Sequence, residues 1–271
     1  MKNTFAKLIF GMITVLASGS ASATSTPPDC SGGGGGNPAC TTWNLTSGVK
    51  TGVAYSGTDA NGHSGTVYDS ASVVAGGHTL SMRAYASTDS NGAAAFTKAY
   101  IGTYGGGIGV SNCYDGSSGC NELTSPDHAI DSNGKHDFLL LEFDSVVSAQ
   151  AFQIGWSDTD SDVELWTGSA SAAAGLDLTG ACVSGCVKTL TSLGFSAGTN
   201  HEGVAVDTNT AINPLSNSRY LLVSGQLGES NDYFKFKSVT ACLPLPVPGT
   251  VALFGVALLG MLGLRRTRKL F

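Results

Sequence analysis

An acidic run in the middle of the chain has the residue types and spacing of a cation site. Asp158, Asp160 and Asp162 stand at alternate positions, and Glu164 follows two residues later. Alternate side chains of an extended segment lie on one face, where mutual repulsion would favour a bound cation such as Ca2+. We predict Asp158, Asp160 and Asp162 as calcium ligands, with Glu164 a weaker candidate. An EF-hand is excluded because Val and Ser occupy its Gly and Glu positions; the alternative to a cation site is a solvated acidic turn.

Two further stretches invite a catalytic interpretation. Residues 125–137 collect two histidines and three aspartates, which a hydrolase could use as base and orienter. No Gly-x-Ser-x-Gly elbow accompanies them, so we interpret the stretch as a polar loop with a hydrogen-bonded His128. Residues 104–109 lack the Gly-Lys-Ser/Thr of a phosphate loop and are interpreted as a turn between strands. We therefore predict no enzyme activity.

Tryptophan side chains could stack on a sugar ring. Trp156 shares one face of an alternating run with Phe152 and Ile154, so we expect it in the core. Trp166 alternates with Leu165 and is expected on the surface. We predict Trp166 as the stacking residue of a glycan site.

The elements that must position these residues are strands. Residues 78–84, 151–156 and 233–237 carry apolar side chains at every second position, and Asn-Gly and Gly-Gly pairs punctuate the chain. Residues 137–143 are almost continuously apolar, which predicts a central strand buried on both faces. No strong helix pattern occurs between 43 and 242. The pattern predicts an all-β fold, specifically an antiparallel β-sandwich resembling a jelly roll.

The C-terminal segment 243–271 joins a proline-rich hinge, an apolar run and a basic end. The run 251–264 would form a transmembrane helix of about 21 Å at ~1.5 Å per residue, shorter than the ~30 Å hydrocarbon thickness. This length suits a transient anchor, although a plain single-pass anchor could also tilt or thin the bilayer to fit. Four cations that would stay on the cytoplasmic side follow the run: Arg265, Arg266, Arg268 and Lys269.

The hinge carries a motif of five residues: Pro246, Val247, Pro248, Gly249 and Thr250. With the apolar run and basic end, this motif resembles the sorting tail of PEP-CTERM proteins, which exosortases process in bacteria that secrete exopolysaccharide. Pro-Gly-Thr replaces the commoner Pro-Glu-Pro, so the resemblance implies a variant exosortase. The order of stretches 99–110, 125–133, 137–143, 153–156, 158–162 and 232–235 is also similar to a family of exosortase-dependent surface proteins, which has no established catalytic residues.

The N-terminal end has the pattern of a secretory signal peptide, residues 1–23. Lys2 and Lys7 precede an apolar run, residues 8–17, that would form a signal helix, and an Ala-Ser-Ala site ends at Ala23. Residues 24–42 are rich in Gly and Pro and are predicted as a flexible leader. Residues 43–242 are then the exported ectodomain.

Export to an oxidising compartment predicts disulfides among the seven cysteines. The pattern leaves the connectivity open, because an odd count leaves at least one thiol outside an internal pair. A zinc site at Cys182 and Cys186 lacks a second pair at suitable spacing. The simplest local pairs are Cys113 with Cys120 and Cys182 with Cys186. A bond between Cys30 and Cys40 would close the leader as a loop.

Charge sets the class of partner. Between the signal peptide and the tail, eight cations face 20 acids, a balance that repels nucleic acid and anionic lipid. We therefore expect a non-enzymatic surface or extracellular-matrix protein. The secretion machinery would export it, an exosortase would sort it after transient residence in the inner membrane, and it would associate with the exopolysaccharide of a biofilm. The alternative is a glycan-binding module or carbohydrate-active enzyme on a β-sandwich. No cofactor is expected apart from the candidate Ca2+.

Overall fold

A computed structural model describes residues 40–58, 64–112, 128–169, 173–213 and 216–243. Within these residues the chain forms strands and two short 3-10 helices, η1 (Leu45–Ser47) and η2 (Thr191–Leu193), and no α-helix. No helix in this described part has the length and hydropathy required to cross a bilayer. The predicted signal peptide and sorting tail lie outside it. The strands are β1 (Cys40–Asn44), β2 (Val49–Thr58), β3 (Ser64–Ala75), β4 (His78–Ser87), β5 (Thr97–Tyr104), β6 (Gly107–Ser111), β7 (Ile130–Asp131), β8 (His136–Thr159), β9 (Val163–Ser169), β10 (Thr199–His201), β11 (Thr210–Ala211), β12 (Asn217–Gly225) and β13 (Asp232–Cys242).

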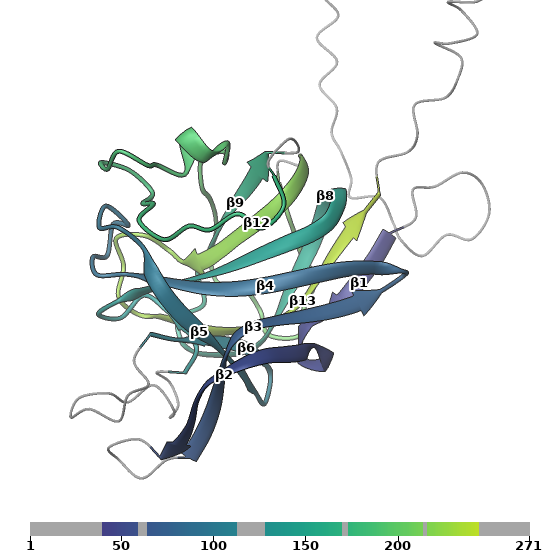
Figure 1. Cartoon of the computed structure of the whole chain (residues 1–271), viewed down its shortest axis with the longest axis horizontal. Coiled ribbons are helices and arrows are strands. Elements are labelled where there is room, and N and C mark those ends of the chain that lie inside the picture. Colours follow the sequence, from purple (N-terminus) through teal and green to yellow (C-terminus); the bar gives the residue numbers. More distant parts are fainter. Residues whose placement is uncertain (1–39, 59–63, 113–127, 170–172, 214–215, 244–271) are drawn as a thin grey trace, which may run out of the picture. The chain divides into compact units, whose positions relative to one another are not determined.

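The strands form one antiparallel sheet that closes on itself (Figure 1). Six of them, β13, β6, β5, β3, β4 and β8, follow one another around a barrel, and pairing between β8 and β13 closes it. Strands β12, β9 and β10 continue the sheet outward from β8, while β1 and β2 flank β13 and β3. The all-β prediction is confirmed. The predicted jelly-roll sandwich is replaced by a six-stranded barrel with added strands.

Strand β8 explains this difference. It is 24 residues long; its first half pairs with β4 and β12, and its second half pairs with β13 and β11. One strand therefore belongs to two parts of the sheet that a sandwich would keep separate. Because its hydrogen bonds run continuously from one part into the other, the sheet closes as a barrel.

The inner core fills the barrel with alternate side chains of its strands. Leu80, Met82 and Ala84 of β4 lie inside, opposite Phe143, Leu141 and Leu139 of β8, and all six are buried. The intervening side chains of these strands point outward. The alternation predicted for residues 78–84 is therefore confirmed.

The outer core lies on the other face of the same sheet. The covering segment, residues 173–198, packs over the outward side chains of β4, β8, β9 and β12. Phe138 and Leu140 of β8 are buried there beside Trp166 and Tyr220. Since Leu139 and Leu141 face the inner core, β8 is buried on both faces over this stretch, as the apolar run predicted.

Two disulfides fix the described chain. Cys182 and Cys186 are bonded within the covering segment, which confirms the local pair expected from their spacing. Cys40 is bonded to Cys242, so the prediction that Cys40 closes the leader with Cys30 is wrong. The reason is the register, since β1 and β13 are antiparallel neighbours that place Cys40 opposite Cys242. Cys30, Cys113 and Cys120 lie outside the described residues.

Candidate metal site where β8 ends and β13 begins

Four carboxylates meet beside the turn from β8 to β9. Asp160 and Asp162 lie in that turn, Asp232 begins β13, and Glu229 lies in the loop that precedes it. One oxygen from each carboxylate lies within 4.8 Å of the others. An isolated bridge between Asp160 and Asp232 joins the two backbone segments, and the Tyr233 amide donates to the Asp160 carbonyl over 3.2 Å. The backbone therefore holds acids from distant parts of the sequence in one cluster.

Asp232 is the buried centre of this cluster. Its Oδ2 accepts from the Gln226 amide at 2.8 Å and the Ser132 hydroxyl at 3.3 Å, and its Oδ1 accepts from the Asp162 amide at 3.2 Å. Burial nevertheless raises the pKa of Asp232 from 3.8 to about 6, with the charges of Asp162 and Glu229 adding to the rise. A bound cation would relieve both the burial of charge and the repulsion.

The remaining oxygens determine what the cluster could hold. Gly203 donates its amide to Asp162 Oδ1 at 2.6 Å, and Asn231 donates to Asp160 Oδ2 at 3.0 Å. Gln226 Nε2 donates to Glu229 Oε1, which leaves Gln226 Oε1 buried and without a hydrogen-bond partner among the described residues. Carboxylate and amide oxygens are the ligands of hard cations, and Ca2+ takes about 6–8 of them, with water completing the shell.

The structure brings together part of the predicted ligand set. Asp160 and Asp162 are in the cluster, whereas Asp158 is exposed, pairs with Tyr233 across the sheet, and accepts a bond from the Thr159 amide. Thr159 has a positive φ of 52°, so the backbone turns between the first two acids and the extended geometry assumed from alternation does not hold. Glu164 lies apart; it accepts from the Leu227 amide at 3.1 Å, and burial raises its pKa.

Sequence reasoning missed the other two acids. Glu229 and Asp232 follow Asp162 by about 70 residues, and no local spacing connects them. The signal available was a Gly-Glu-Ser-Asn-Asp turn at 228–232 directly before a strand, which marks another strand-end acidic loop. Only the pairing of β8 with β13 places the two loops together.

The histidine-rich stretch is divided by the fold. His136 is fully buried in β8, donates through Nε2 to the Gly225 carbonyl at 2.9 Å, and has its pKa lowered by burial. His128 is buried with its ring 4.1 Å from the ring of Tyr104. Asp137 accepts a bond from the Asn112 amide at 2.9 Å. The polar-loop interpretation is therefore wrong for residues 130–131 and 136–137, which are buried in strands β7 and β8. The turn interpretation of 104–109 is confirmed, because β5 and β6 pair through residues 104 and 107.

The two tryptophans exchange the environments expected for them. Trp166 is only 2% exposed, so the prediction of an exposed stacking face is wrong. The covering segment causes this burial, and Gly198 approaches so closely that an added Cβ would lie 2.8 Å from the indole nitrogen. Trp156 is half-buried instead, with the Lys235 ammonium 4.3 Å from its ring centre. A register shift beside Lys235 interrupts the alternation that placed Trp156 in the core.

Comparison with known proteins found no match among protein-family models, curated proteins or solved structures.

Proposed function

We propose that the chain is a non-enzymatic surface or extracellular-matrix protein. It is exported, sorted by an exosortase through its C-terminal tail, and associated with exopolysaccharide. The observation that carries this proposal is the Cys40–Cys242 disulfide. It joins the first strand residue to the last one, as suits a domain that works in an oxidising compartment. The sorting motif begins four residues after this bond, so cleavage there would leave every described strand and both disulfides intact.

Processing of the tail tests the proposal. In cells that contain the exosortase, we expect the mature protein to be found outside the inner membrane and to lack Arg265 and the residues after it. Changing Pro248→Ala together with Gly249→Ala should retain the tail and the protein in the membrane, whereas Pro244→Ala, outside the motif, should be processed normally. Mass spectrometry of the mature chain gives the answer. A surface protein that still carries residues 265–271 would contradict exosortase sorting.

We also propose Ca2+ binding at the carboxylate cluster as a second function. The observation that favours it is the convergence of Asp160, Asp162, Glu229 and the buried Asp232 beside the orphan oxygen of Gln226. A cation that binds only the folded chain stabilises it by about 2.7 kcal/mol at 100 times its Kd. The bound ion would join the β8–β9 turn to the start of β13 and stiffen that end of the barrel.

The calcium proposal is tested by thermal unfolding with Ca2+ and with a chelator. We expect Ca2+ to raise the Tm of the wild-type chain and of the Asp158→Asn variant. The Tm of the Asp162→Asn variant should be the same with Ca2+ and with the chelator. Asp158→Asn is a matched control, because it removes the same charge from the end of β8, two residues before Asp160 and outside the cluster. Equal Tm values in Ca2+ and chelator for the wild-type chain would remove the proposal.

A further inference from the structure

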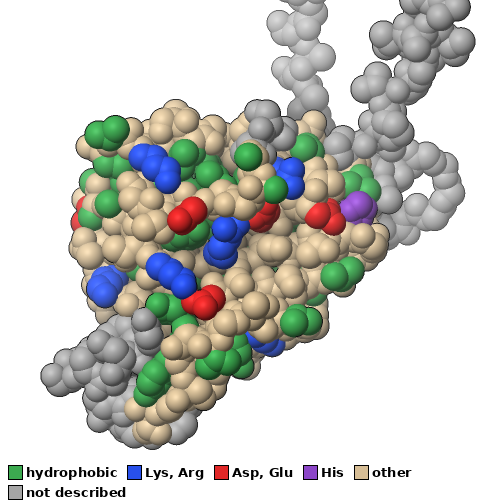
Figure 2. All heavy atoms as spheres, viewed as in Figure 1, with side chains coloured by type: hydrophobic (Ala, Val, Ile, Leu, Met, Phe, Trp, Pro, Cys, Tyr) green, Lys and Arg blue, Asp and Glu red, His purple; other side chains and the backbone are tan. Residues whose placement is uncertain are grey.

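A polar cleft lies on the outside of the barrel and shares no lining residue with the carboxylate cluster. It has a volume of about 290 Å3 and opens between the outer faces of β3, β4 and β5 and one turn of the covering segment. Figure 2 shows a face of the molecule where basic and acidic side chains stand in small groups among hydrophobic side chains, other side chains and backbone. The cleft is lined by Asp69, Arg83, Ala84, Tyr85, Lys98, Asp177 and Thr179.

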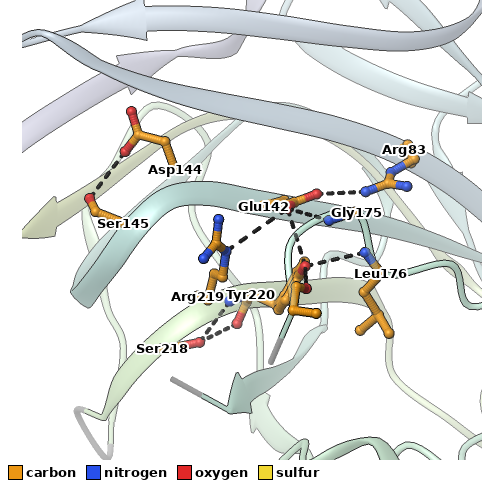
Figure 3. A network of polar contacts seen from close by, with 10 residues as sticks. Arg83, Glu142, Asp144, Ser145, Gly175, Leu176, Ser218, Arg219 and Tyr220 are labelled. Carbon is orange, nitrogen blue, oxygen red and sulfur yellow. Dashed lines mark hydrogen bonds and ion pairs between the residues drawn. The ribbon is translucent and has the colours of Figure 1, made fainter. Parts of the chain in front are cut away.

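Arg83 is held in a fixed orientation at this cleft. Its Nη2 donates to Glu142 Oε2 at 2.6 Å, as Figure 3 shows. Glu142 is held in turn through Oε1, which accepts from the Gly175 amide at 2.7 Å and the Tyr220 hydroxyl at 3.1 Å. The Arg83 side chain is still 29% exposed. One of its five N–H groups is engaged by described residues, and the others remain available to a ligand.

The other charged groups are oriented by their own partners. Asp177 Oδ1 accepts from the amide and the hydroxyl of Thr179, both at 2.9 Å, and from the Tyr85 hydroxyl at 3.3 Å. The Thr179 amide is the main cause that lowers the pKa of Asp177, so its carboxylate stays ionised. Lys98 Nζ lies 2.5 Å from Asp69 Oδ1 and 5.2 Å from the ring centre of Tyr100. Among described residues, the second oxygens of Asp69 and Asp177 accept no hydrogen bond.

We infer that this cleft binds a neutral saccharide unit. A sugar hydroxyl donates one hydrogen bond and accepts others, so it is recognised where an oriented carboxylate and an oriented cation face the same space. The cleft offers both, from Asp69 and Asp177 and from Arg83 and Lys98. The two charges of each sign cancel, and the surrounding chain is acidic, so an anionic sugar gains no net attraction. The volume is near the lower bound of ~300 Å3 for ligand sites, which suits one or two sugar residues.

This inference deepens the proposed association with exopolysaccharide and rests on that function for its biological meaning. It replaces the glycan site expected at Trp166. The buried ring cannot stack on a ligand, whereas Lys98 and Asp69 are exposed at the cleft, Arg83 is partly exposed, and all three are already oriented by their partners.

The test is affinity electrophoresis of the full chain, purified in detergent, through gels containing dextran, mannan, arabinogalactan or the acidic polymer alginate. We expect retardation by at least one neutral polymer, little change with salt, and none by alginate. Lys98→Ala and Asp177→Ala should each weaken the binding about 10-fold or more, as expected for a lost charge-assisted hydrogen bond. Lys135→Ala removes an exposed cation outside the cleft and should bind as the wild-type chain does.

Three outcomes overturn the inference: no retardation by any neutral polymer, retardation that Lys98→Ala and Asp177→Ala both leave unchanged, or binding to alginate alone. An unfolding curve of each variant separates lost binding from lost folding. Because the Lys98 and Asp177 side chains are exposed, we expect both variants to unfold as the wild-type chain does. Failure here leaves the surface function intact, since that function is decided by the mature C-terminus in cells.

Discussion

The two cores of this protein share strands but differ in what closes them. The inner core is enclosed by the barrel, where paired strands with continuous backbone hydrogen bonds surround the apolar side chains. The outer core has a sheet on one side only. Its other side is the covering segment, which within the described residues contains only two short pieces of regular structure: η2 and one isolated bridge that pairs Cys182 with Thr189.

The difference teaches how an irregular segment can seal a hydrophobic layer. The backbone of the covering segment is joined to the rest of the chain by isolated hydrogen bonds. The Phe96 amide donates to the Ala181 carbonyl at 2.6 Å, and the Gly180 amide donates to the Phe96 carbonyl at 2.9 Å. The Gly175 amide donates to the Glu142 carboxylate. The hydroxyl of Tyr220, in strand β12, accepts a hydrogen bond from the Leu176 amide at 3.2 Å. Because each contact is separate, we expect the outer core to open locally while the barrel unfolds as a unit.

The largest expected effect comes from the disulfides. The Cys40–Cys242 bond joins residues that are 202 positions apart in the sequence, whereas the Cys182–Cys186 bond joins residues that are 4 positions apart. Replacing the first pair by Ala therefore opens a much longer loop. Chain entropy alone predicts a loss of about 5 kcal/mol in the free energy of unfolding for the first pair and about 2 kcal/mol for the second. Urea unfolding measures both. A larger loss for the Cys182 and Cys186 pair would mean that the covering segment, not the barrel, limits stability.

Truncating one phenylalanine in each core separates the two modes of unfolding. Phe143→Ala removes a buried ring that packs edge-on against Trp43 at 5.4 Å, and should cost about 3–5 kcal/mol of global stability. Phe195→Ala lies in the covering segment itself, which can relax, so the global loss should be smaller. Hydrogen exchange should then accelerate within 173–198 and stay slow in β4 and β8. Uniform acceleration in both regions would show that the two cores are one cooperative unit.

The pH dependence of stability should have opposite signs in the two regions. Asp232, at the barrel, has a pKa raised from 3.8 to about 6, so its contribution is present below pH ~4 and is lost as the pH rises through 6. The shift corresponds to about 3 kcal/mol. Asp177, in the covering segment, has a lowered pKa, so its contribution is present above 3.8 and is lost on acidification.

Urea midpoints at pH 4.5 and 7.5, without Ca2+, check these signs. Asp232→Asn should abolish most of the fall in stability between the two values. Asp177→Asn should leave that fall unchanged and reduce the loss of stability seen below pH 4. A wild-type midpoint that rises from pH 4.5 to 7.5 would show that Asp232 does not dominate the barrel.

Local sequence patterns predicted which face of a strand each side chain occupies, because the backbone alternates neighbouring side chains between the two faces. The alternation at 78–84 gave the inner face of β4, and the continuous run at 137–143 gave a strand with two buried faces. The same reasoning placed Leu165 and Trp166 on opposite sides of β9, which is right. It could not say that residues 173–198 would return to cover the second side.

The carboxylate cluster divides in the same way. Asp160 and Asp162 could be proposed from spacing, because both oxygen ligands lie in one turn. Glu229 and Asp232 required the pairing of β8 with β13, and Asp158 was lost to a single positive φ at Thr159.

The sequence by itself determined the β class, the faces of individual strands and the acidic character of the region between the two ends, because side-chain period and charge are local properties. Only the tertiary structure decided the closure of the barrel, the burial of Trp166, the partner of Cys40 and the membership of the acidic cluster. Each of these depends on which distant segments lie against one another. That choice is made by the total free energy of packing and pairing, which no short window of residues contains.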